Sequence, residues 1–114
     1  MTTYVPERGD IMHVDLNPSV GQEQRGKRYV FVISPSTFNQ LGLALVAPIT
    51  LGGNQSRNVG FAVSLSVSGL RTQGVVQSEQ LRTIDYRVRS AAFIERAPRQ
   101  VVDEVLARAE TLVR

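Results

Sequence analysis

Three side chains in this sequence have the types and spacing to act on an anionic ligand: Glu23, Arg28 and Thr50. Arg28 directly precedes the apolar run 29–33, so packing behind it would hold its guanidinium at the mouth of a strand. A charge that is fixed in advance needs no reorganisation when negative charge develops on a substrate. Thr50 follows a second apolar segment and offers a hydroxyl. The pattern indicates an anion site where two strands end.

Each of these residues also has an ordinary structural interpretation. Arg28 can form a salt bridge with Glu23 or Asp85, and Thr50 can cap a turn. His13 is the single histidine, and we interpret it as a partly exposed strand residue, because it has no acid–base partner. The carboxylates are scattered without the spacing of a metal cage. We therefore expect an activity without metal or cofactor.

Composition indicates one globular domain over residues 1–114, with 42% hydrophobic and 20% charged residues. The chain has no cysteine, no apolar run long enough to span a membrane and no apolar signal segment. These features predict a cytoplasmic protein without a membrane partner. The net charge is +3, and all basic residues except Lys27 are arginine, whose planar fork suits phosphate. Codon bias and solubility explain the same bias equally well.

The polar–apolar pattern predicts strands followed by one helix. Strands are expected at 11–16, 29–34, 41–49, 61–66 and 74–81, the last continued by a short piece at 82–84. Pro48 is expected at an edge or exit of the third strand. A short helix is expected at 35–40, and apolar residues from Val101 to Val113 recur at helical spacing after Pro98. The predicted fold is mainly β, a small curled barrel of about five strands with a C-terminal amphipathic helix.

Several ordered blocks resemble the MazF/PemK/Kid toxins of type II toxin–antitoxin systems, most nearly their ChpB-like branch. The likeness covers essentially the whole chain, and the order of the blocks makes it specific. The blocks are RGDIMHVDLNPSVGQEQRGKRYVFVISP, LVAPIT, GFAVSLS, RTQGVV and EQLRTIDYRVR.

The resemblance implies an SH3-like barrel that forms a homodimer and cleaves single-stranded mRNA selectively by sequence, without metal. It also implies a cognate antitoxin whose extended tail covers the RNA site. Arg28 matches the residue taken as catalytic in the family, and Thr50 and Glu23 match other residues of its site. Phe61 and Arg89 match positions implicated in RNA contact.

Three departures concern the acid–base set of the Kid branch. That branch has histidine, arginine and aspartate where this chain has Gln22, Gln77 and Glu79. Tyr29 replaces the usual proline after the catalytic arginine. The Kid mechanism therefore does not transfer unchanged, although MazF and ChpB relatives also lack parts of this set.

The mechanism that the resemblance implies is attack of the RNA's own 2′-hydroxyl on the adjacent phosphorus. Arg28 would stabilise the phosphorane, Thr50 would hold a phosphate oxygen, and Glu23 or Glu79 would act as the base. The residues expected to contact RNA are Gln22, Phe61, Gln77, Gln80 and Arg89.

Two other functions stay open at this point. One is a toxin of the same architecture that binds a protein such as gyrase, as CcdB does, and cleaves nothing. The other is a barrel that binds RNA without cleaving it, which the residues Gln22, Gln77 and Glu79 favour.

Overall fold

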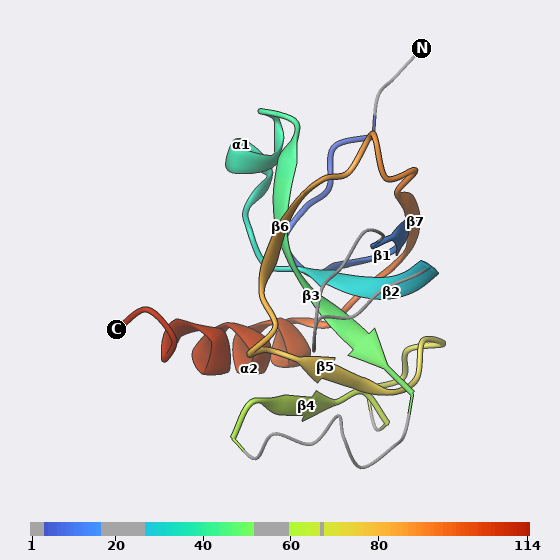
Figure 1. Ribbon diagram of the computed structural model, residues 1–114. Coiled ribbons are helices and arrows are strands. Elements are labelled where there is room, and N and C mark those ends of the chain that lie inside the picture. The colour runs from blue at the N-terminus through green and yellow to red at the C-terminus, as the bar shows by residue number, and fades with distance from the viewer. Residues whose placement is uncertain (1–3, 17–26, 52–59, 67) are drawn as a thin grey trace.

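The computed structural model describes residues 4–16, 27–51, 60–66 and 68–114, and Figure 1 shows a curled sheet with helices at both ends. The helix from residue 99 lies across the lower part of the sheet. The elements, in chain order, are β1 (Asp10–Asp15), β2 (Lys27–Val32), α1 (Ser36–Asn39), β3 (Leu43–Thr50), β4 (Ala62–Ser64), β5 (Val75–Gln77), β6 (Arg82–Asp85), β7 (Ala92–Arg96) and α2 (Arg99–Glu110).

The strands form one antiparallel sheet in the order β4-β5-β3-β2-β1-β7, and β6 also pairs with β3. Within the described residues the sheet is curled but not closed, since β4 and β7 end the ordered path. The predicted class, mainly β with a C-terminal helix, is confirmed. The strand number differs: the expected fifth strand is divided into β5 and β6 by a turn, and β7 is additional. The sequence does not indicate β7, because its exposed and half-buried residues do not alternate.

The central strand β3 explains why Pro48 is tolerated inside the sheet. One edge of β3 pairs with β2, and Pro48 lies opposite Val30 there. The other edge is shared, because β6 pairs with residues 43–46 and β5 with residues 49–50. Pro48 lies between these two stretches, where a missing N–H interrupts neither ladder. Pro48 thus lies two residues before the end of β3, at a stretch of edge that neither neighbour pairs, which agrees with the expectation of an edge or exit.

Alternation along the strands gives the sheet two buried faces. One face includes Ile11, Phe31 and Ile49 and is covered by α2, which buries Val101 and Val105 against it. The burial of Val101, Val105 and Ala109 confirms the predicted amphipathic helix. It ends at Glu110, earlier than expected, and Leu112 and Val113, predicted for its apolar face, are 43% and 80% exposed. The other face carries a second apolar cluster: Met12, Val14, Leu16, Val30, Val32, Ala44, Val46, Ile84 and Tyr86.

A buried polar cluster joins the start of the chain to α1, whose existence the sequence predicts. The Asn39 amide donates to the carbonyls of Pro6 at 2.8 Å and Ser34 at 3.0 Å. Its oxygen accepts the Ser34 hydroxyl at 2.6 Å, and the Ser34 hydroxyl in turn accepts the Leu45 amide at 2.9 Å. The Tyr86 hydroxyl donates to the Asn39 carbonyl. All these side-chain groups are paired inside the protein, which identifies the cluster as structural.

Neither helix in the part of the chain that the structure describes has the length and apolarity to cross a membrane.

Candidate functional site

The pairing register puts Arg28 and Thr50 on one face of the sheet, at neighbouring strand ends. Arg28 lies opposite Val14 of β1. Tyr29 and Ile49 form the last pair of the β2–β3 ladder, and Arg28 and Thr50 are the next residues beyond that pair. Side chains alternate along a strand, so both residues point to the same face. The two residues that the sequence predicts for the site therefore lie at the same end of the sheet.

The same register adds Gln77 and Arg82 to this face. Thr50 pairs with Val75 of β5, so Gln77, two residues along, points to the same side. Arg82 pairs with Val46, whose side chain also belongs to this face. We call Arg28, Thr50, Gln77 and Arg82 the polar patch; it continues the second apolar cluster across the same face.

Three buried polar atoms in Thr50 and in the turn after β5 have no hydrogen-bond partner among the described residues: Thr50 Oγ1, Ser78 Oγ and Gln80 Oε1. Ser78 is fully buried and follows Gln77, which is itself only 1% exposed. Buried polar atoms in folded proteins are nearly always paired, so a group of exceptions calls for a cause. Donors and acceptors kept for a ligand are such a cause. Glu79, half-buried in the same turn, supplies a carboxylate beside them.

Two arginines hold the end of β1 close to the patch. Arg82 Nη1 donates to the Leu16 carbonyl at 2.9 Å, and Arg89 Nη1 donates to the Asp15 carbonyl at 2.9 Å. Asp15 is the residue opposite Lys27 at the start of β2. Arg89, predicted to contact RNA, thus lies near Arg28 and also supports the β1 strand end.

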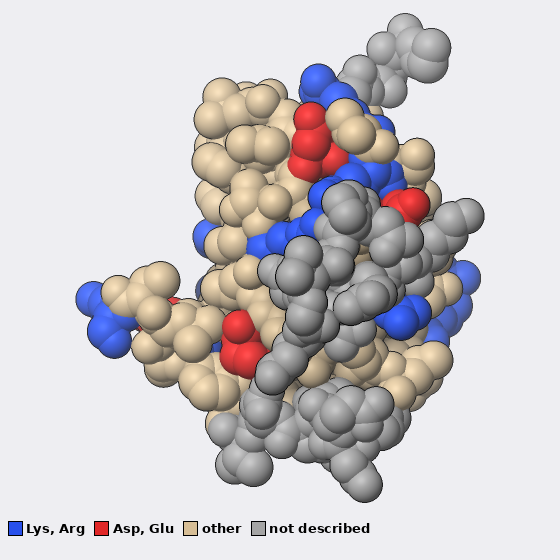
Figure 2. Space-filling view, in the orientation of Figure 1, with Lys and Arg blue, Asp and Glu red and all other residues tan. Residues whose placement is uncertain are grey.

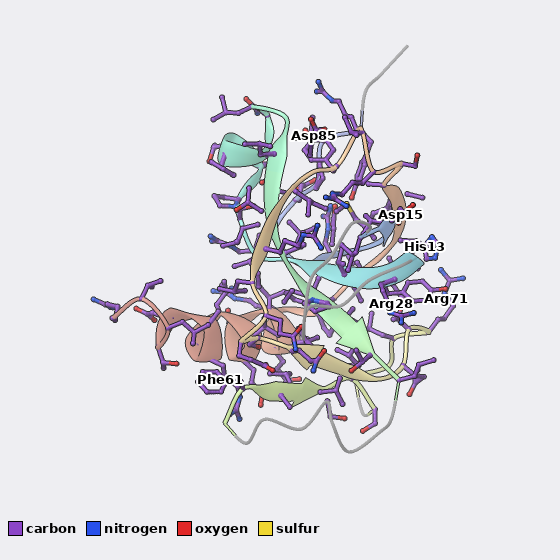
Figure 3. The ribbon with its side chains drawn as sticks, in the orientation of Figure 1. His13, Asp15, Arg28, Phe61, Arg71 and Asp85 are labelled. Carbon is purple, nitrogen blue, oxygen red and sulfur yellow. The ribbon has the colours of Figure 1, made fainter. Side chains whose placement is uncertain are left out.

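The structure does not gather all the predicted site residues. Gln22 and Glu23 lie outside the described residues. Phe61 is half-buried and lies beside α2, on the other side of the molecule from Arg28 (Figure 3). Asp85 is also well separated from Arg28 in this view, so the alternative salt bridge between them does not form. Asp85 instead accepts the Arg87 and Val88 amides, both at 3.1 Å.

Positive charge marks this end of the sheet. Figure 2 shows basic side chains in a band over β6 and again at the right edge, where Figure 3 labels Arg28 and Arg71. Arg28 is exposed at the surface. His13 is partly exposed, as predicted, and its ring contacts the Tyr29 ring edge-on at 5.1 Å. The charge and the exposed rings suit an anionic ligand with planar groups.

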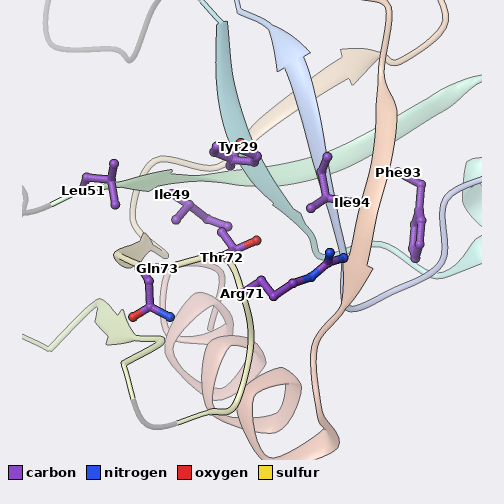
Figure 4. A pocket seen from close by; sticks show the side chains of 8 residues that line it. All are labelled: Tyr29, Ile49, Leu51, Arg71, Thr72, Gln73, Phe93 and Ile94. Carbon is purple, nitrogen blue, oxygen red and sulfur yellow. The ribbon is translucent and has the colours of Figure 1, made fainter.

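The opposite face of the same sheet end has a hollow of 490 Å³ (Figure 4). Tyr29, Ile49 and Leu51 line one side of it, because they alternate with Arg28 and Thr50 along β2 and β3. The sequence does not predict this hollow, since the rest of its wall comes from an irregular segment without periodicity and from β7. Its only sequence signal is the block RTQG before β5. The remaining lining residues are Arg71, Thr72, Gln73, Phe93 and Ile94.

Glu95 of β7 binds this irregular segment. Its carboxylate accepts the Thr72 amide and the Thr72 hydroxyl, both at 2.6 Å, and the Arg71 amide at 3.2 Å. The hydrogen bond from the Thr72 side chain, with those from the two amides, lowers the pKa of Glu95 against the opposing effect of burial. The carboxylate is therefore held in its charged form.

The chain matches known proteins over nearly its whole length. Residues 7–113 match the family of PemK-like, MazF-like toxins of type II toxin–antitoxin systems. Endoribonuclease PemK of Escherichia coli is 46% identical over 94% of this chain and 81% of its own. Endoribonuclease toxin ChpB of Escherichia coli K12 is 45% identical over 94% of this chain and 93% of its own.

Solved structures agree with these sequence relatives. MazF from Deinococcus radiodurans has a TM-score of 0.87 at 32% identity, covering 97% of this chain and 98% of its own. A MazE–MazF structure from the same organism has a TM-score of 0.81 at 32% identity, with 97% of both chains covered. These matches confirm the resemblance on which the sequence interpretation depends. By sequence and by fold, the chain belongs to the PemK-like, MazF-like toxins of type II toxin–antitoxin systems.

Proposed function

We propose that this toxin is an endoribonuclease that cleaves single-stranded RNA at the polar patch, without a metal ion, and so stops translation and growth. The observation that carries the proposal is that Arg28 and Thr50 lie on one face at the same end of the sheet, and that the buried Thr50 hydroxyl has no hydrogen-bond partner among the described residues. The names of the related endoribonucleases support the same activity.

The reaction is a transfer within the RNA. The 2′-oxygen forms a bond to the adjacent phosphorus as the bond from phosphorus to the 5′-oxygen breaks. The proton of the 2′-hydroxyl passes to a base, and the leaving 5′-oxygen takes up a proton. The products are a 2′,3′-cyclic phosphate and a free 5′-hydroxyl, and no redox step or cofactor is needed.

Arg28 stabilises the negative charge that grows on the phosphoryl oxygens. Guanidinium groups keep their charge in proteins and form paired hydrogen bonds to phosphate. The same constant charge makes arginine a poor proton donor, so Arg28 acts by electrostatics. Thr50 Oγ1 donates to a phosphoryl oxygen, which gives its buried hydroxyl a partner. Such donors act because they are positioned before the reaction begins.

A glutamate takes the proton of the 2′-hydroxyl. Glu79 follows β5 directly after Gln77 and Ser78, and its half-buried position is suited to a base close to the patch. Glu23 is the other candidate, from the family resemblance.

The RNA is read in single-stranded form, where base edges are accessible. Gln80 offers an amide group to these edges, with Gln22 as a further contact. Gln77 is predicted from the sequence to contact RNA as well, but it is only 1% exposed. Arg89 and the neighbouring basic side chains bind the phosphate backbone. Phe61 lies away from the patch within one chain. It can contact RNA that extends from the patch across the same molecule, or RNA bound at the patch of a second copy.

The biological setting completes the proposal. The toxin works in the cytoplasm as a homodimer. Its cognate antitoxin neutralises it by covering the basic RNA site with an extended acidic segment, since such a segment would compete for the same arginines.

The test uses the full chain and a defined single-stranded RNA in buffer with EDTA. We expect cleavage by the wild type and a rate lower by about a hundredfold or more for Arg28→Ala. Arg99→Ala is the matched control, because that side chain is 93% exposed on α2. Its rate should equal that of the wild type.

Binding of RNA by the wild type without any cleavage would contradict the proposal and support the non-catalytic barrel. Neither binding nor cleavage would favour a toxin that acts on a protein. Equal cleavage rates for the wild type and Arg28→Ala would remove Arg28 from the mechanism.

A further inference from the structure

We propose that Glu95, which lies on β7 outside the polar patch, is a positioning residue for Thr50. It acts through the irregular segment of residues 71–74, which we call the clamp segment. The inference rests on the proposed function, because it concerns how the catalytic hydroxyl is held in place.

The first step is the contact between Glu95 and Thr72. Both Thr72 bonds to the carboxylate are 2.6 Å, and the Arg71 amide adds a third at 3.2 Å. Thr72 is 8% exposed, and the side chain of Glu95 is 15% exposed. Hydrogen bonds from three donors to a shielded carboxylate hold it much more strongly than a surface ion pair does. The 3.9 Å contact between Glu95 and the exposed guanidinium of Arg71 adds little.

The second step is the contact between Gly74 and Thr50, two residues after Thr72. Gly74 has a φ of +118°, a conformation that residues with a side chain rarely adopt. A Cβ on Gly74 would overlap the carbonyl oxygen of Thr50 and lie 3.1 Å from its carbonyl carbon. The clamp segment therefore packs backbone against backbone on the residue that carries the proposed catalytic hydroxyl.

The third step is the position of Thr50 at the end of its strand. Thr50 is the last residue of β3, and Leu51 after it is 75% exposed. Beside Thr50 lies β5, a strand of three residues that forms two pairs with β3 and three with β4. The clamp segment leads directly into β5, so its position affects where β5 meets Thr50. Glu95 holds the clamp segment from β7, and the Leu65 amide donates to the Gly74 carbonyl at 2.9 Å.

The consequence is a residue that touches no substrate and still sets the rate. Small displacements of a catalytic group cost large factors in rate, because the reacting geometry is lost. Loss of the Glu95 contact is expected to lower kcat, which depends on the Thr50 position, more than KM, which depends mainly on the arginines.

The experiment is a double-mutant cycle on the full chain, measured at a temperature where every variant is folded. Glu95→Gln should lower kcat by about tenfold with KM changed by about twofold or less. Thr72→Val should also lower kcat. Thr72→Ser should keep the wild-type rate, because serine retains the hydroxyl. Glu110→Gln on α2 makes the same chemical change at an exposed site and serves as the control.

The cycle is completed in a Thr50→Val background. If Glu95 acts through Thr50, Glu95→Gln should then change kcat by about twofold or less. The same tenfold loss in both backgrounds would overturn the proposal, as would a loss confined to KM.

Amide hydrogen exchange separates this proposal from the proposed function. Glu95→Gln should accelerate exchange at Leu65, whose amide reports the position of Gly74. Faster exchange together with no cleavage by the wild type would refute the nuclease and retain the positioning contact. Unchanged exchange at Leu65 would refute the positioning contact, whatever the nuclease does.

Discussion

Two groups of buried polar side chains in this protein differ in one respect. Around α1, the amide of Asn39 and the hydroxyls of Ser34 and Tyr86 all have partners inside the chain. In Thr50 and in the turn after β5, Thr50 Oγ1, Ser78 Oγ and Gln80 Oε1 have no partner among the described residues. The atoms of both groups are buried, so burial alone does not distinguish them.

The difference separates a structural cluster from a functional one. A buried polar group without a partner carries a desolvation cost of about 1–3 kcal/mol, whereas a paired group contributes modestly to stability. The α1 cluster is therefore expected to stabilise the free protein, whereas the unpartnered Thr50 hydroxyl is expected to carry a cost that the proposed RNA ligand would remove. Functional sites commonly carry such a local cost.

The strongest test of this contrast is Thr50→Val, which replaces a hydroxyl by a methyl group of similar size. The cleavage rate should fall about a hundredfold, because a positioned donor is removed. The free energy of unfolding should stay equal or rise, because a buried hydroxyl without a partner is removed. RNA cleavage kinetics and urea unfolding on the same preparations check both halves. A loss of stability would show that the Thr50 hydroxyl supports the fold, as the side chains of the α1 cluster do.

The second test is Asn39→Ala, which should lower the stability of the fold and leave the cleavage rate nearly unchanged. Its removal leaves the Pro6 and Ser34 carbonyls and the Ser34 hydroxyl without their partner, at a cost of about 3 kcal/mol in unfolding free energy. Thermal unfolding should shift down by about 10 °C. Cleavage well below the transition should stay within about twofold of the wild type.

Asn39→Asp sharpens the same test, because a carboxylate cannot donate to the two carbonyls that the amide now meets. It should destabilise the fold at least as much as Asn39→Ala. A cleavage defect without loss of stability in either variant would contradict the structural assignment.

The smallest effect concerns pH, through Glu95. Its pKa is lowered in the folded protein by the hydrogen bonds from Thr72 and Arg71, so the folded state favours the charged carboxylate. This contribution to stability is complete above the ordinary value of 4.5 and is lost as pH falls through the lower folded value. Between pH 5 and 8 we expect no change from this group.

Urea unfolding of the wild type and Glu95→Gln at a series of pH values measures this contribution. The difference in stability between the two proteins should be constant above about pH 5 and shrink below pH 4.5. A difference that persists unchanged at pH 3 would show that the contact does not depend on the charge of Glu95.

The sequence indicated which residues share one end of the sheet better than it indicated the contacts between distant segments. Arg28 before an apolar run and Thr50 after another were sufficient to expect an anion site, because strand ends of one sheet meet at a common edge. The irregular segment before β5 is predicted by the sequence only as part of a family block. What holds this segment in place is Glu95, which lies more than twenty residues later in the chain. Periodicity carries no information about such a contact.

Local pattern by itself determined the β class, the amphipathic helix at the C-terminus and the expectation of an anion site at Arg28, because each of these depends on neighbouring residues. Only the tertiary structure decided that Pro48 lies inside a central strand, that Gly74 packs on Thr50 and that Phe61 lies away from Arg28. These placements follow from which strands pair and in which register, and a register is chosen by the whole sheet rather than by any one strand.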